Sequence, residues 1–226
     1  MRFPPHKIAG ICMVLSFAGA CGPRSEPVDL ASEVTDFKTL FDENCIGCHG
    51  ADGKHGPAPV LNSPVYLALV PQESLRQTIE QGRPGTPMPA FAQSQGGPLS
   101  DAQVNALVTG IRQQWAQAED LNGVTLPPYN APSGVADHAR GKEVFAMACA
   151  SCHGNQGRAG SITDRSFLSL ISDQGLRTST IVSRPDLGAP DWRGYIPGRA
   201  LNNQEIDEVV AYLVSLRSNA ATSGGE

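Results

Sequence analysis

The chain has 226 residues and a formal net charge of −5, with 40% hydrophobic and only 6% aromatic residues. This length allows one medium domain or two small ones, and the negative charge argues against a nucleic-acid partner. With 24 glycines and 18 prolines, the composition favours a helical shell with long loops over a large self-sufficient core.

Residues 1–20 are predicted to be a signal peptide. Arg2 and Lys7 form a positive start, and the apolar run over 8–18 is too short to span a bilayer. Losing these two charges takes the formal net charge from −5 to −7. A surface of that sign suits docking on the basic face of a redox partner, although it is also an ordinary means of solubility.

Cys21 follows three small residues, a pattern that resembles the lipid-attachment box of bacterial lipoproteins. In that interpretation Cys21 becomes the lipid-modified N-terminus, and residues 21–31 form a tether above the membrane. Simple cleavage and release is the alternative. Both interpretations place the mature chain outside the cytoplasm, in the periplasm.

The next segment, 32–118, is predicted to be helical, with long loops rich in glycine and proline. Apolar residues recur at helical spacing in its last helix, which Ser100 and Asp101 cap. The expected helices are 34–44, 72–81 and 102–115, and the expected loops are 50–64 and 85–91.

The first predicted helix leads directly into the motif C-x-x-C-H at Cys45, Cys48 and His49. This pentapeptide is the attachment signature of a c-type haem. The two thiols add to the vinyl groups of the haem as thioethers, and the histidine binds the iron from one face. A zinc site or a thioredoxin-like redox pair are the alternatives for a C-x-x-C pair.

The same motif returns at Cys149, Cys152 and His153, 104 residues further on. A zinc ribbon needs two C-x-x-C pairs about 15–20 residues apart, so this spacing favours two haems. The two remaining cysteines lie at Cys12 and Cys21, which leaves none for a disulfide within the two segments. Covalent haem would give each small domain its apolar nucleus instead.

Residues 119–134 contain three prolines and are predicted to be a linker. The segment 135–218 then repeats the order of the first, with residues 219–226 as a flexible tail. Its expected helices are 137–148, 165–172, 176–183 and a final helix capped by Asn202 or Asn203. The copies align at nearly constant offsets, 104 at the cysteines and 101 at the Arg-Pro pairs, which indicates an internal duplication.

Each segment resembles a class I cytochrome c domain, which implies an all-α fold of two tandem domains. In that family the first and last helices cross closely, with a glycine on one and an aromatic on the other. The second copy fits with Gly141 and Tyr212, whereas the first has Phe37 at the glycine position and Gly110 at the aromatic position. We expect large and small residues to have exchanged sides at one crowded contact.

The resemblance implies His49 and Met88 as the two ligands of the first iron. Met88 lies in a Pro-Met-Pro turn, where the prolines restrict the backbone on both sides and hold the sulfur in place. A thioether favours ferrous iron and raises the potential. Pro59 resembles the family proline whose carbonyl accepts the Nδ1 hydrogen of the ligating histidine, with Pro57 as the alternative.

His153 is expected to bind the second iron, but Ala189 stands where Met88 stands in the first copy. No methionine follows Met147, which is interpreted as a packing residue. The sixth position is then open or holds water, or a substitute binds there. The candidate substitutes are Asp191, Tyr195 and His138.

Arg83 and Arg184 precede the two turns and are candidates to neutralise haem propionates, with solvated surface arginines as the alternative. The leading functional hypothesis is an electron carrier, and not an enzyme, with two haem c groups and redox protein partners. Electrons are expected to run from the second, lower-potential haem to the first. The alternatives are an enzyme that reduces peroxide or a nitrogen oxide at the second haem, and a haem subunit of a larger respiratory or dehydrogenase complex.

Overall fold

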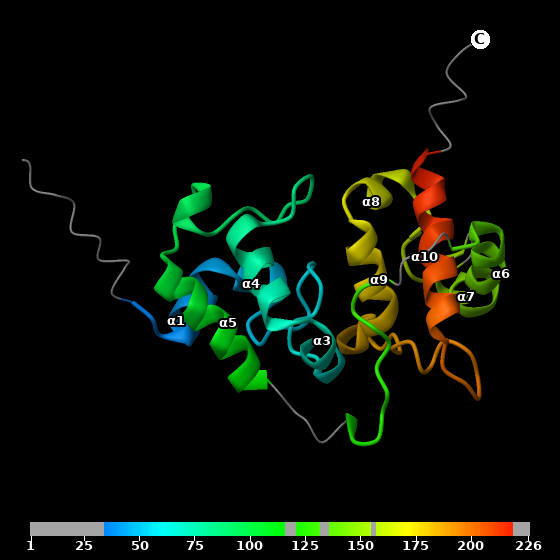
Figure 1. Cartoon of the computed structure of the whole chain (residues 1–226), viewed down its shortest axis with the longest axis horizontal. Helices are drawn as coiled ribbons and strands as arrows, with labels where there is room; N and C mark the ends of the chain where they lie inside the picture. Colours follow the sequence, from blue (N-terminus) through cyan, green and yellow to red (C-terminus); the bar gives the residue numbers. More distant parts are fainter. Residues whose placement is uncertain (1–33, 116–120, 132–135, 155–156, 219–226) are drawn as a thin grey trace, which may run out of the picture. The chain divides into compact units, whose positions relative to one another are not determined.

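Helices of four to sixteen residues, joined by long loops, make up the computed structural model, which describes residues 34–115, 121–131, 136–154 and 157–218 (Figure 1). Within these ranges no strand forms beyond two isolated bridges, so the fold is all-α as predicted. The predicted signal peptide, Cys21 and the C-terminal tail lie outside the described residues. The first half contains α1 Phe37–Asn44, α2 Ile46–His49, α3 Pro64–Leu69, α4 Gln72–Gln81 and α5 Asp101–Trp115. The second half contains α6 His138–Ala148, α7 Ala150–His153, α8 Arg165–Ser169, α9 Asp173–Val182 and α10 Asn203–Ser218.

Side-chain caps explain where the helices begin. Asp36 accepts a hydrogen bond from the amide of Thr39, so α1 begins three residues later than the apolar pattern predicts. Ser172 caps α9 in the same way, through the amide of Gly175, and α9 therefore begins three residues earlier than expected. The helix 72–81 is confirmed with both its bounds.

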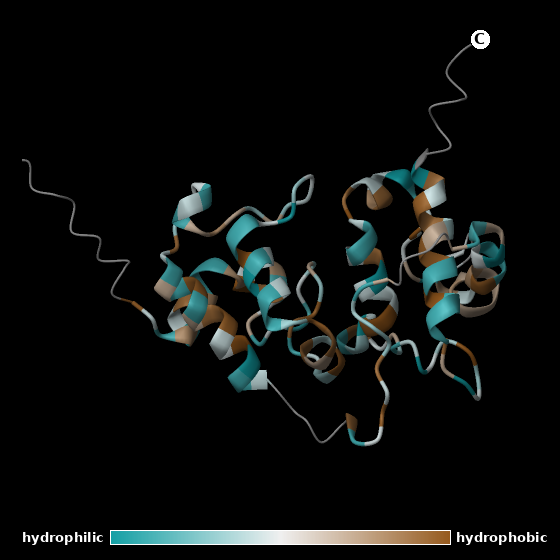
Figure 2. Ribbon diagram, viewed as in Figure 1, coloured by the Kyte–Doolittle hydropathy of each residue, from teal (hydrophilic) through white to brown (hydrophobic). Residues whose placement is uncertain are grey.

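The helix α3 was not expected, because its six residues lie where a glycine- and proline-rich loop ends. Ser63 caps it, Pro64 occupies its first turn, and four of its residues are buried. Figure 2 shows the apolar colour along most of α3, in contrast to the hydrophilic outer face of α4. A short helix that is apolar nearly all round is buried, and this one belongs to the core.

The two halves repeat the same hydrogen bonds at the start of their last helices. In the first half Ser100 and Gln103 each accept a hydrogen bond from the amide of the other. Asn202 and Glu205 do the same in the second half. This reciprocal pair is a capping box, and its repetition supports the internal duplication that the sequence indicates.

A second repeated feature ties the last helix of each half to the end of a short helix. Arg112 donates to the carbonyls of Leu67 and Val70 at the end of α3. Arg217 donates to the matching carbonyls, of Leu168 and Ile171, at the end of α8. The same anchor therefore holds both halves, although the residues around it differ.

The helix crossings show the predicted exchange of large and small residues. A methyl group on Gly110 would lie 2.2 Å from the ring of Phe37, and one on Gly141 would lie 1.9 Å from the carbonyl oxygen of Glu208. Tyr212 packs beside Gly141, with its ring 5.5 Å from that of Phe145. Each crossing therefore has room for one large side chain and not for two.

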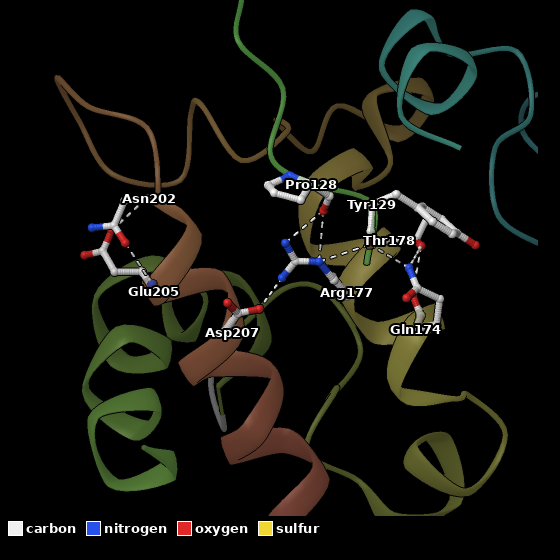
Figure 3. A network of polar contacts seen from close by, with 8 residues as sticks. All are labelled: Pro128, Tyr129, Gln174, Arg177, Thr178, Asn202, Glu205 and Asp207. Carbon is white, nitrogen blue, oxygen red and sulfur yellow. Dashed lines mark hydrogen bonds and ion pairs between the residues drawn. The ribbon is translucent and has the colours of Figure 1, made fainter. Parts of the chain in front are cut away.

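Pro128 and Tyr129, in the described part of the predicted linker, are hydrogen-bonded to the helices that follow. Arg177 of α9 is 1% exposed and donates to the carbonyls of Pro128 and Tyr129, while its other end pairs with Asp207 of α10 (Figure 3). Gln174 donates to the Tyr129 carbonyl as well, at 2.9 Å. These bonds fasten the described part of the linker to the α9–α10 layer.

Candidate haem sites

Each C-x-x-C-H motif lies where a helix ends and a short turn of helix begins. Cys45 ends α1 and Cys149 ends α6, and each amide donates to a carbonyl four residues back in its helix. Both of these cysteines are half-buried, whereas Cys48 and Cys152 are exposed. The four thiols form no disulfides, so all are available for attachment.

The surroundings of Cys45 and Cys149 favour an uncharged sulfur over a thiolate. Burial raises the pKa of the Cys45 thiol to about 12 and that of Cys149 to about 11. An apolar setting of this kind suits a thioether better than the thiolate that a zinc ion requires. Among the described residues, no three His, Cys, Asp or Glu side chains converge as they do around a bare metal ion.

Both histidines are held through Nδ1, which leaves Nε2 as the ring nitrogen that can bind an iron. Nδ1 of His49 lies 2.9 Å from the carbonyl oxygen of Pro59, and Nδ1 of His153 lies 2.8 Å from that of Gly160. A proton on Nδ1 leaves Nε2 with a free electron pair. Burial lowers the pKa of His49, which keeps the imidazole neutral. This arrangement fits a c-type haem at both sites.

The loop behind each histidine closes on the motif through a glycine. A methyl group on Gly56 would lie 2.2 Å from the Cys48 carbonyl oxygen, and one on Gly157 would lie 2.0 Å from that of Cys152. The amide of Ala58 donates to the Cys48 carbonyl at 2.9 Å. Sequence reasoning missed these glycines, although their offset of 101 equals that of the Arg-Pro pairs and marks them as equivalent.

The two turns that were compared for the far ligand have different bonding. In the first, the amide of Arg83 donates to the carbonyl of Met88, and the amide of Met88 donates to the Thr86 hydroxyl. Met88 is half-buried. In the second, the amide of Ala189 donates to the carbonyl of Arg184.

Among the candidate substitutes at the second site, Asp191 has its carboxylate bound by the guanidinium of Arg193 at 2.6–3.2 Å. His138 is exposed at the first position of α6. The side chain of Tyr195 is half-buried against the core, and burial raises the pKa of its phenol. The phenol of Tyr195 lies within electrostatic range of the Cys149 thiol.

The two arginines that precede the turns both reach toward the other half. A methyl group on Gly175 of α9 would lie 3.5 Å from Nη1 of Arg83. Arg184 donates to the carbonyl of Gly56 at 2.8 Å and binds the carboxylate of Asp186 through two of its nitrogens. Asp186 is a further residue that sequence reasoning missed.

Comparison with known proteins places both halves in one class. A family model described as "Cytochrome C oxidase, cbb3-type, subunit III" matches residues 32–109, and one described as "Cytochrome c" matches residues 138–217. The Cbb3-type cytochrome c oxidase subunit FixP of Bradyrhizobium sp. (strain ORS 278) is 30% identical over 228 residues, which cover 93% of this chain and 71% of that protein. The chain belongs to the family of dihaem c-type cytochromes.

Two other relatives of the cytochrome match different extents. The cytochrome c subunit of the cytochrome bc1 complex of Corynebacterium diphtheriae is 23% identical over 84% of this chain and 69% of that protein. The dihydro-heme d1 dehydrogenase of Pseudomonas aeruginosa is 35% identical over 41% of this chain, but only over 19% of its own length. The cytochrome therefore carries two covalently bound haem c groups and transfers electrons.

Proposed function

We propose that the cytochrome is an extracytoplasmic electron carrier whose first haem is bound by His49 and Met88 and whose second is bound by His153 with no methionine opposite. The observation that carries this is the duplicated bond from histidine Nδ1 to a loop carbonyl, combined with Met88 in one turn and Ala189 in the other. When bound, each haem iron takes up and releases one electron.

The residues around the iron set the difference between the two sites. The Arg83–Met88 backbone bond ties the Pro-Met-Pro turn that presents the thioether, and a thioether ligand favours the ferrous state at the first site. Ala189 offers no donor atom at the second site. The midpoint potential of the second site is therefore lower than that of the first. Tyr195 is the side chain best placed to approach the second iron.

The relatives support a place in a respiratory chain. FixP and the bc1 cytochrome c subunit are, by name, subunits of an oxidase and of a bc1 complex. By analogy this cytochrome exchanges electrons with redox protein partners as a subunit or a close associate of such a complex. None of the described helices is both long and apolar enough to cross a bilayer. The lipid on Cys21 is proposed as the membrane anchor.

The test is a redox titration of the purified full chain, followed by its visible spectrum, with Met88→Ala as the matched variant. Two transitions are expected in the wild type. In Met88→Ala the higher one moves to lower potential, and the weak long-wavelength band of ferric methionine-ligated haem disappears. A single transition, or a higher transition that ignores Met88→Ala, contradicts the ligand assignment.

An enzyme acting at the second haem is the other candidate, favoured only by Ala189 in the turn. It predicts steady turnover of peroxide or a nitrogen oxide by the reduced full chain, lost in His153→Ala but kept in Met88→Ala. Reoxidation by a protein partner with no such turnover supports the carrier instead.

A further inference from the structure

A carboxylate from the second half holds the backbone of the loop behind the first haem motif. Oδ2 of Asp186 accepts a hydrogen bond from the amide of His55 at 2.8 Å, across 131 residues of sequence. Arg184 binds both oxygens of the same carboxylate at 2.8 and 2.9 Å, and it also donates to the carbonyl of Gly56. Two consecutive residues of one half are thus held by one ion pair of the other.

Burial of the carboxylate and three hydrogen bonds fix the position of Asp186 in this ion pair. The side chain of Asp186 is 0% exposed, and its two oxygens together accept three hydrogen bonds. The hydrogen bond from Arg184 is the main reason that the pKa of Asp186 falls to about 2, so the carboxylate is charged under ordinary conditions. A buried carboxylate that accepts three hydrogen bonds, two of them from one guanidinium, is held in a single geometry, unlike an ion pair of two exposed side chains.

The loop that the Arg184–Asp186 ion pair contacts, residues 51–60, has an unusual backbone conformation. His55 has φ = 64°, a region that residues other than glycine rarely adopt. Gly56, next to it, packs so closely on the Cys48 carbonyl that no side chain fits. Three residues further on, the Pro59 carbonyl accepts the Nδ1 hydrogen of His49. The held segment is therefore continuous with the acceptor that orients the iron ligand.

We infer that Arg184 and Asp186 are positioning residues for His49, so that the second half of the chain orients the ligand of the first haem. The inference rests on the proposed haem site at His49. The first copy has Gly85 where Asp186 stands in the second, so no equivalent carboxylate acts in the opposite direction. The effect is one-way: a change in the turn of the second half reaches the first site.

The test uses Asp186→Ala in the full holoprotein, with hydrogen exchange of peptides from the loop 51–60 and redox titration as the two measurements. We expect faster exchange in that loop and a shift of the first-site midpoint to higher potential. Loss of the held loop weakens the hydrogen bond from His49 and makes the imidazole less basic, and loss of the negative charge acts in the same direction. Asp186→Asn keeps an acceptor for the His55 amide, so its exchange should be intermediate.

The matched control is Asp191→Ala. It removes a carboxylate from the same turn, one that accepts its hydrogen bonds from Arg193. It should leave both the loop exchange and the first-site midpoint unchanged. The inference is overturned if Asp186→Ala leaves the first-site midpoint in place, with or without faster exchange, or if Asp191→Ala shifts it equally. A wild type without a methionine-ligated transition would instead overturn the proposed ligands, and the loop exchange would still report the contact.

Discussion

Replacing Gly141 by alanine tests how closely the α6–α10 crossing is packed. The new methyl carbon would lie 1.9 Å from the carbonyl oxygen of Glu208 and 2.8 Å from Cβ of Tyr212. An ordinary contact between carbon and oxygen is about 3.3 Å, so the helices must separate by roughly 1 Å or more. The obstacle is helix backbone, which cannot turn away as a flexible side chain can.

The expected cost follows from two opposing contributions. Overpacking a tight site costs about 1–3 kcal/mol, and a clash with backbone belongs at the upper end. Alanine gains about 1 kcal/mol over glycine in a helix interior. The net expectation for Gly141→Ala is a loss of about 2 kcal/mol in the free energy of unfolding of the second half.

The assay is denaturant unfolding of the holoprotein followed by far-ultraviolet circular dichroism, with Lys142→Ala as the matched control. Lys142 is the exposed neighbour on the same helix, so its change should stay within about 0.5 kcal/mol. A Gly141→Ala protein as stable as the wild type, or more stable, would show that the crossing is looser than the structure has it.

Three other changes test separate parts of the account. Gly110→Tyr should destabilise the first half by about 1–3 kcal/mol, and adding Phe37→Gly should restore part of that loss in a double-mutant cycle, whereas additive losses would refute the exchange of sizes. The hydrogen bond from Arg184 lowers the pKa of Asp186 from 3.8 to about 2, so the stability that this ion pair contributes is complete above about pH 4 and is lost toward pH 2. Asp186→Asn should therefore lose less stability than the wild type between about pH 4 and pH 2 in an acid titration. An acid profile identical to that of the wild type would contradict this contribution. Arg177→Met should cost about 3–5 kcal/mol in denaturant unfolding because the largely buried Asp207 and the Pro128 carbonyl lose their donor, and a cost below 1 kcal/mol would show that the linker is not fastened there.

The sequence was sufficient for features that depend on local chemistry. The two C-x-x-C-H motifs need only their own residues, and the helix 72–81 has no competing cap, so its bounds were predicted correctly. The exchange between Phe37 and Gly110 could be predicted because the second copy supplied a template for the crossing.

Other features depend on atoms or contacts that sequence patterns do not encode. The carbonyl of Gly160 holds His153, and any residue could supply that carbonyl. The contact from Asp186 to His55 spans 131 residues and follows no periodicity. The roles of Arg83 and Arg184 toward haem propionates and the domain bounds 32–118 and 135–218 stay predictions.

The most direct measurement of the central claim is the haem content and ferric visible spectrum of the purified full chain, compared with Met88→Ala. Two covalently bound haems per chain are predicted, with one methionine–iron band in the wild type that Met88→Ala removes while both haems stay attached. A chain that carries one haem or none, or a band that survives in Met88→Ala, would contradict it.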